Sequence, residues 1–212
     1  MKSALIVQGG AELHEPGEVS RILGNVLEEN GFEVEISDTL DSYRDLNKLK
    51  ELDLIVPCWM GLRRSSIEQD QLKPLLEAVS CGTGIAGLHG GMCGSFRQET
   101  EYQYMTGGQF VVHPGGIVTY TVHIVDPEHP LTRGIKDFTV TSEQYYMHVD
   151  PANFVLTTTN FGDVVMPVSW IKMWGKGRVF YSSLGHDAEG VRQVEVRELM
   201  KRGMLWAAEK QV

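Results

Sequence analysis

The chain has 212 residues, of which 42% are hydrophobic and 22% charged, a balance typical of soluble globular proteins. This length favours a single domain over residues 1–212. The net charge of −9 argues against nucleic-acid partners and against an anionic membrane surface. No apolar stretch approaches the ~20 residues of a membrane-spanning helix. The three cysteines lack metal-type pairing, which indicates reduced thiols in a cytoplasmic protein.

The first ninety residues alternate between two hydrophobic patterns. Short apolar runs that end in glycine or a polar residue are typical of buried parallel strands. Segments with apolar residues at three- and four-residue spacing predict helices between them. The predicted strands cover residues 4–10, 32–36, 54–59 and 84–88, and the predicted helices cover residues 16–30 and 65–81.

The pattern changes after residue 109. Several β-rich runs, separated by turn signals such as Pro114-Gly115-Gly116, extend to about residue 181, and a last helix covers residues 194–208. The alternating first half predicts an α/β fold with a doubly wound, mostly parallel, flavodoxin-like sheet. The added β-rich segment is expected to extend the sheet or to form an antiparallel flap over its edge.

The stretch from Gly84 to Gly94 organises these predictions. Its apolar run stops at one polar residue, His89, and two glycines follow at once. A buried strand that ends in a tight turn at a sheet edge has this pattern, and such edges carry ligand and catalytic groups. We therefore predict that His89 is the functional centre. The structural alternative is a glycine-rich loop whose histidine caps a helix.

Two motifs resemble the class I glutamine amidotransferase-like fold. Gly87-Leu88-His89-Gly90-Gly91 has the glycine spacing of that fold's G-x-C-x-G elbow, with histidine in place of the nucleophilic cysteine. The segment 180–189 resembles the strand that delivers a histidine and an acid, with one extra residue between them. The resemblance implies a relative that has lost its nucleophile and has no glutaminase activity. A cysteine amidohydrolase would need Cys93 as a thiolate close to the elbow.

The chain also resembles the ThuA-like (trehalose utilisation) branch, and this resemblance spans nearly the whole sequence. The matching motifs occur in order at residues 87–91, 102–116, 126–134, 143–146 and 177–181. The family implies a role in the metabolism of trehalose or a related disaccharide, with a small-molecule sugar ligand. It supplies no reaction mechanism, and the fold alone does not settle one.

Acid/base chemistry and metal binding are both open for the predicted site. His89 and His186 converge at strand ends if they follow the fold relatives, and His148 could join them. Three imidazoles around an open position suit zinc or another divalent metal that activates a water molecule. Glu143 is a further candidate ligand, and Glu189 a candidate general base. In the metal-free alternative, His89 and His186 act directly as acid/base groups.

Five further residues are candidates for substrate contacts. His14 follows the first strand and lies on the expected active edge, and His113 precedes a turn. The aromatic rings of Trp59 and Tyr146 offer faces on which sugars pack, although core packing is the default role of such rings. Arg63 follows the third strand and could bind an anionic group.

These observations predict an intracellular enzyme that acts on a sugar or keto-sugar derivative by histidine acid/base chemistry, with or without a metal. Hydrolase, lyase and isomerase activities are all compatible with such a site. The alternative is a non-catalytic sugar-binding or assembly protein that kept the fold. Association into a homo-oligomer through the β-rich half is also expected.

Overall fold

The computed structural model describes residues 1–61 and 65–210. One half of its central sheet consists of five parallel strands, in the order β2-β1-β3-β4-β11. This is the flavodoxin-like strand order, in which the chain reverses direction beside the first strand. The strands are β1 (Lys2–Gly10), β2 (Phe32–Ser37), β3 (Leu54–Met60), β4 (Gly84–Leu88) and β11 (Gly177–Ser182).

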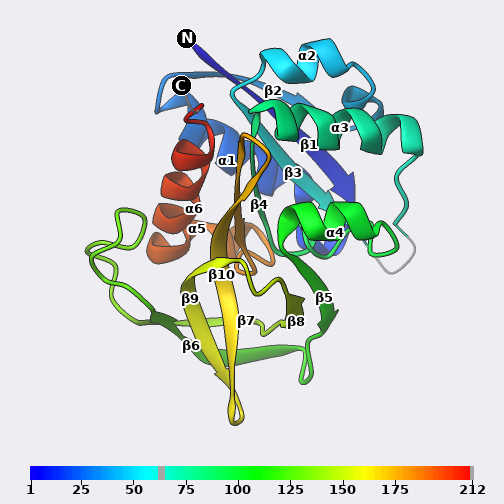
Figure 1. The fold of residues 1–212 in the computed structure, drawn as a ribbon. Helices are drawn as coiled ribbons and strands as arrows, with labels where there is room; N and C mark the ends of the chain where they lie inside the picture. Colours follow the sequence, from blue (N-terminus) through cyan, green and yellow to red (C-terminus); the bar gives the residue numbers. More distant parts are fainter. Residues whose placement is uncertain (62–64, 211–212) are drawn as a thin grey trace.

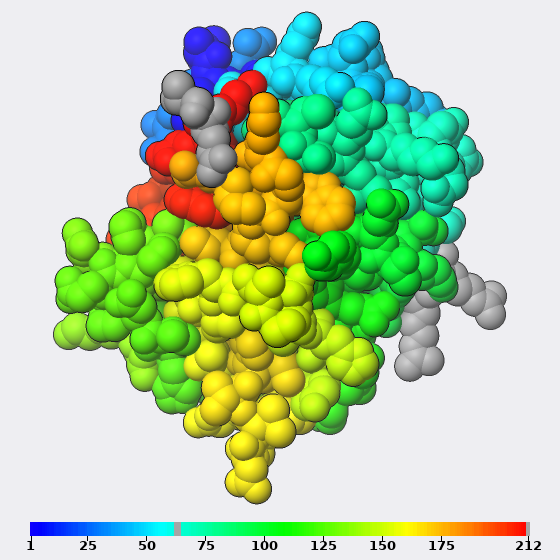
Figure 2. Space-filling view, in the orientation of Figure 1, coloured from blue at the N-terminus to red at the C-terminus, as the bar shows by residue number. Residues whose placement is uncertain are grey.

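The second half of the sheet is antiparallel and continues from β11 in the order β10-β9-β6-β7. Its strands are β6 (Ile117–Ile124), β7 (Phe138–Glu143), β9 (Phe154–Phe161) and β10 (Val164–Trp174). The turn between β9 and β10 protrudes from one end of the molecule (Figures 1 and 2). A separate two-stranded sheet pairs β5 (Gly108–Val112) with β8 (Tyr146–Val149).

Helices cover both faces of the parallel half (Figure 1). Alternate residues of β1 enter two hydrophobic cores, because Ala4 and Ile6 face one side and Leu5 and Val7 the other. The first face packs against α1 (Pro16–Glu28), α5 (Ala188–Arg192) and α6 (Val194–Ala207), and the second against α2 (Leu46–Glu51), α3 (Gln69–Cys81) and α4 (Thr100–Thr106). No helix in the described part of the chain is long and apolar enough to cross a membrane.

The predicted doubly wound α/β sheet is therefore confirmed, and the β-rich segment extends it. Short 3-10 helices lie between these elements: η1 (Glu12–His14), η2 (Leu40–Tyr43) and η3 (His89–Gly91). The turn η3 lies close against β3, because a Cβ on Gly91 would be 3.0 Å from the backbone Cα of Cys58. Glycine at this position thus lets the turn after β4 approach the neighbouring strand.

Candidate functional site

Three strand ends of the parallel half bring three histidines to one edge of the sheet. His14 follows β1, His89 follows β4 and His186 follows β11. The carboxyl ends of parallel strands meet at a common edge, so these side chains converge. Glu143, the last residue of β7, reaches the same place from the antiparallel half. One donor atom from each residue lies within 4.8 Å of the others. We call these four residues the His₃Glu cluster.

Three members of the cluster form a compact triangle of donor atoms. His89 Nε2 lies 3.2 Å from Glu143 Oε2 and 3.3 Å from His186 Nδ1. The third side, between His186 Nδ1 and Glu143 Oε2, measures 3.6 Å. Zinc bonds of roughly 2.0–2.1 Å in tetrahedral geometry place neighbouring ligand atoms about 3.3–3.4 Å apart. The triangle therefore has the dimensions of one face of a metal coordination sphere.

The orientation of His89 is fixed by its other ring nitrogen. His89 Nδ1 lies 2.9 Å from the carbonyl oxygen of Ser183. A carbonyl oxygen only accepts hydrogen bonds, so Nδ1 carries the proton and Nε2 presents its lone pair to the cluster. Burial lowers the pKa of His89, which favours this neutral form. Metal-binding histidines are commonly oriented in this way.

The backbone at His89 has the strained geometry of an elbow. Its φ of 44° lies in the left-handed region, which residues with a side chain rarely adopt. The hydroxyl of Tyr181 donates to the His89 carbonyl oxygen at 3.0 Å and supports this turn. The side chain itself has no exposed surface. The apolar run of β4 and the glycines after it thus present one histidine at the sheet edge.

The remaining members of the cluster carry shifted pKa values. Burial raises the pKa of Glu143, but the neighbouring imidazoles of His186 and His89 outweigh this effect and hold the pKa below its usual range. Hydrogen bonding to Glu143 raises the pKa of His186, partly offset by burial. Burial, with smaller contributions from His89 and His186, lowers the pKa of His14 to about 4. The lowered pKa values favour the neutral forms of His14 and His89, and neutral imidazoles beside a carboxylate are suitable ligands for a divalent metal; His186 would lose its proton on binding one.

His14 provides a separate indication of a ligand. The side chain is 9% exposed, and its Nδ1 is buried without a hydrogen-bond partner. Its ring centroid lies 4.7 Å from that of His186 and 5.5 Å from that of His89. Buried polar atoms usually have a partner, so the unsatisfied Nδ1 leaves His14 able to take up a further group. One nitrogen of the same ring lies within 4.8 Å of the other donor atoms of the cluster. The residue predicted as a substrate contact is thus a fourth candidate ligand.

Tyr145, in the motif at residues 143–146, is a site residue whose contact with His89 the sequence does not predict. Its hydroxyl lies 2.8 Å from His89 Nε2, and its ring is buried. Burial raises the pKa of Tyr145 well above its ordinary value, so the hydroxyl keeps its proton. Adjacent residues of an extended chain face opposite sides, so Tyr145 and the predicted Tyr146 do not share the site. The ring of Tyr146 packs edge-on against Phe161 instead.

Other predicted residues lie outside the His₃Glu cluster. His148 is exposed on β8, opposite Gln109 of β5, and is not brought to the predicted metal site. Glu189 is exposed on α5. The Nε2 atom of His113 lies 3.6 Å from Glu143 Oε1, at the border of the cluster. The ring of Trp59 lies against Gly9 and fills the space of a Cβ there. Arg63 falls outside the described residues.

A groove of about 790 Å³ opens beside the cluster and continues along β7 and α5. We call it the β7–α5 groove. It joins the cluster through His186, and hydroxyl, carboxylate and amide groups line much of it. These residues include Thr139, Thr141, Ser142, Asp187, Glu189 and Gln193.

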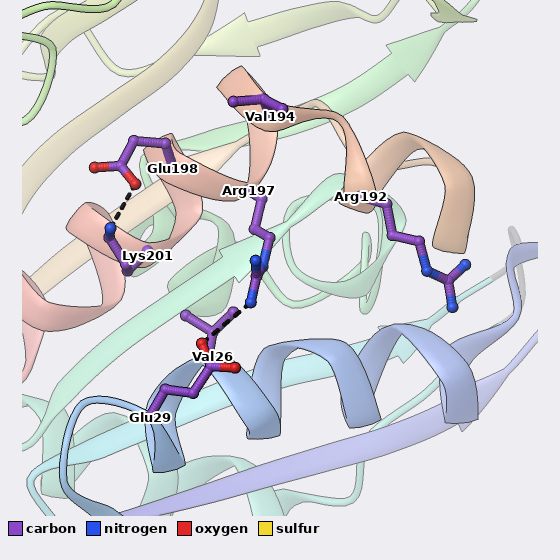
Figure 3. Close-up of a pocket in the computed structure, with 7 residues that line it drawn as sticks. All are labelled: Val26, Glu29, Arg192, Val194, Arg197, Glu198 and Lys201. Atoms are coloured by element: carbon purple, nitrogen blue, oxygen red, sulfur yellow. Dashed lines mark hydrogen bonds and ion pairs between the residues drawn. The ribbon is translucent and has the colours of Figure 1, made fainter.

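A smaller hollow of about 210 Å³ lies between α1 and α6 (Figure 3). Its basic side chains are paired with acids: Arg197 lies 3.2 Å from Glu29, and Lys201 lies 2.5 Å from Glu198. Arg192 is paired with Glu18. Because these charges are compensated, the hollow offers little attraction to an anion, and the His₃Glu cluster is the better candidate site.

Cys93 does not have the environment of a nucleophile. The side chain is completely buried, and this burial raises the pKa of its thiol. A reactive cysteine needs a thiolate in an accessible, electropositive setting. His89 therefore occupies the elbow position, and no activated thiol accompanies it among the described cysteines.

Several solved structures have the same fold, and three of them are proteins with different names. A ThuA-like protein from Parabacteroides merdae is 19% identical with a TM-score of 0.79, and the match covers 100% of this chain and 92% of that one. A cytoplasmic protein from Salmonella typhimurium is 14% identical, with a TM-score of 0.66 and coverage of 99% and 100%. A glutamine amidotransferase from Thermotoga maritima is 11% identical, with a TM-score of 0.62 and coverage of 99% and 99%.

At these identities the three structures show the fold alone. No protein with a curated description matches the chain. The sequence pattern of one family, described as trehalose utilisation, matches residues 3–207 and thus nearly the whole chain. The chain belongs to the ThuA family.

Proposed function

We propose that this protein is an enzyme of carbohydrate metabolism that acts on a sugar or keto-sugar derivative at a divalent metal, such as zinc. The observation that carries the proposal is the triangle of His89 Nε2, His186 Nδ1 and Glu143 Oε2, with sides of 3.2, 3.3 and 3.6 Å. Family membership supports the role in carbohydrate metabolism. His14, which has one ring nitrogen within 4.8 Å of the other donor atoms, completes the proposed ligand set.

The chemistry follows from the residues around the cluster. A bound divalent metal polarises a sugar hydroxyl, a carbonyl or a water molecule. Ser183 keeps His89 in the tautomer that offers Nε2. The β7–α5 groove offers hydroxyl and carboxylate partners for sugar hydroxyls. We assign the role of general base to Glu189, a carboxylate in the wall of this groove. Hydrolysis, elimination and isomerisation of a sugar all use these elements.

Three further expectations belong to the same proposal. The buried thiol of Cys93 makes glutaminase activity unexpected. A cytoplasmic location agrees with the reduced state expected for the cysteines. Association into a homo-oligomer agrees with the apolar side chains exposed on the antiparallel half, among them Phe154, Val164 and Val165.

The experiment measures the metal content of the protein purified without an affinity tag. The parent and His148→Ala should carry near-stoichiometric metal, whereas His186→Ala should lose it. Trehalose, other neutral disaccharides and their oxidised derivatives are then tested for turnover with and without a chelator. The proposal predicts turnover that the chelator abolishes. Equal metal content in both variants, or no metal in the parent, would contradict the metal site and favour acid/base catalysis or sugar binding alone.

A further inference from the structure

The hydroxyl of Tyr145 donates a hydrogen bond to the lone pair of His89 Nε2, which is the lone pair that a metal would use. His89 Nδ1–H donates a hydrogen bond to the backbone carbonyl oxygen of Ser183, so His89 Nε2 can only accept. The Tyr145 hydroxyl, 2.8 Å from Nε2, is then the donor of the bond between them. A single lone pair cannot bind a metal ion and accept a hydrogen bond along the same direction. Metal binding at His89 and the hydrogen bond from Tyr145 are therefore mutually exclusive.

The ring of Tyr145 is held in place independently of this hydrogen bond. Its centroid lies 4.3 Å from the Phe110 ring and 4.3 Å from the His89 ring, and the residue is 6% exposed. A packed ring cannot carry its hydroxyl far away, because buried aromatic side chains have little free volume. After losing its acceptor, the hydroxyl remains beside the cluster and needs a new partner.

We propose that Tyr145 masks His89 Nε2 in the metal-free protein and that metal binding releases its hydroxyl as a hydrogen-bond donor to the oxygen or anion at the open coordination position. The inference rests on the proposed function and extends it, since it assigns the group that positions the sugar oxygen at the metal. Tyr145 acts as a positioning residue for the metal and as a direct contact for the ligand.

The test compares Tyr145→Phe with Tyr146→Phe, a matched control whose ring packs against Phe161. Co²⁺ affinity is measured by competition with a chromophoric chelator, and azide binding to the Co²⁺ protein is followed by absorption. Removing the competing hydroxyl should tighten Co²⁺ binding by about three- to tenfold, the range of one net hydrogen bond. Losing the donor should weaken azide binding by a similar factor, and Tyr146→Phe should change neither.

Each other outcome counts against the inference. Weaker Co²⁺ binding in Tyr145→Phe would make Tyr145 a ligand or a purely structural residue. Tighter Co²⁺ binding with unchanged azide binding would remove the donor role. Equal Co²⁺ affinity in the parent and Tyr145→Phe would overturn the masking but leave the proposed function in place, whereas a parent that binds no Co²⁺ would overturn both.

Discussion

The two halves of the sheet contribute to the site in different ways. The parallel half provides His14, His89 and His186, each in the segment after a strand whose carboxyl end opens at the same edge. The antiparallel half provides Glu143 and Tyr145, which arrive from its outermost strand and the segment after it. The imidazoles thus depend on local strand endings, whereas the carboxylate and the hydroxyl depend on how the added strands fold back.

The parallel half therefore acts as the scaffold that brings the histidines together, and the antiparallel half adds the groups that complete the site. A doubly wound sheet brings strand ends together in any relative with the same topology, which explains how one fold supports many chemistries. The negative charge of the cluster comes entirely from Glu143 in the antiparallel half. Changes at Glu143 should therefore alter the charge of the site, whereas changes at His14, His89 or His186 should alter its nitrogen donors.

The largest effect on stability is expected at a buried ion pair of the antiparallel half. Lys172 on β10 lies 2.8 Å from Asp150, and the two side chains are 7% and 14% exposed. Asp150→Ala removes the hydrogen bonds that Asp150 accepts from Lys172 and from the Ala152 amide, while Lys172 keeps its bond to the Tyr104 carbonyl oxygen. The free energy of unfolding should fall by about 3 kcal/mol, because a hydrogen bond to a charged group is lost together with a turn contact. Glu35→Ala, which breaks the exposed pair with Lys48 in the parallel half, should cost under about 1 kcal/mol.

The Asp150 effect should also depend on pH. The hydrogen bond from Lys172 lowers the pKa of Asp150 from its usual 3.8. Its contribution to stability is complete above the unfolded value of 3.8 and is lost as the pH falls through the lower folded value. In urea unfolding, the difference in free energy of unfolding between the parent and Asp150→Ala should be large at neutral pH and smaller in acid. An equal free-energy difference at both pH values would contradict a stabilising ion pair between Asp150 and Lys172.

Glu143→Gln tests the contribution of the antiparallel half to the cluster. The amide keeps the shape of the side chain but removes its negative charge, so metal affinity should fall by about 100-fold. Isothermal titration with Zn²⁺ measures this change. Glu189→Gln, on the wall of the groove, should bind Zn²⁺ like the parent. An unchanged affinity in Glu143→Gln would place the metal elsewhere.

Gly91→Ala tests the packing of the elbow in the parallel half. The added methyl group would lie 3.0 Å from the Cα of Cys58 and 3.1 Å from the carbonyl oxygen of Pro57, both backbone atoms of β3. We expect a loss of about 2 kcal/mol in thermal or urea unfolding. Gly90→Ala is the matched control, because its nearest neighbour is the Tyr145 hydroxyl at 3.5 Å, an ordinary contact distance. Equal stability of the two variants would refute this packing argument.

The smallest effect on stability is expected on the exposed face of β7, at Thr141 in the wall of the β7–α5 groove. The hydroxyls of Thr119 and Thr141 form an exposed cross-strand hydrogen bond of 2.8 Å between β6 and β7. Thr141→Val should lower the free energy of unfolding by about 0.5 kcal/mol. A loss several times larger would show that β7 depends on this pair for its position.

The sequence predicts the parallel half well because its signals are local. An apolar run that stops at His89 and two glycines marks both a buried strand and its functional end. The positions of Glu143 and Tyr145 depend on the order of the antiparallel strands, which hydrophobic alternation does not specify. The same limit explains why the sequence points to His148 and Tyr146 as site residues. They are close in sequence to Glu143 and Tyr145 but face away from the His₃Glu cluster.

The central claim is most directly tested by anomalous diffraction at the zinc absorption edge from crystals grown with Zn²⁺. The account predicts one strong peak within about 2.0–2.2 Å of His89 Nε2, His186 Nδ1 and a Glu143 oxygen. It also predicts that the Tyr145 hydroxyl no longer hydrogen-bonds to His89 Nε2. An empty cluster in crystals that bind Zn²⁺ elsewhere would contradict the metal site and leave the four residues as a hydrogen-bonded acid/base group.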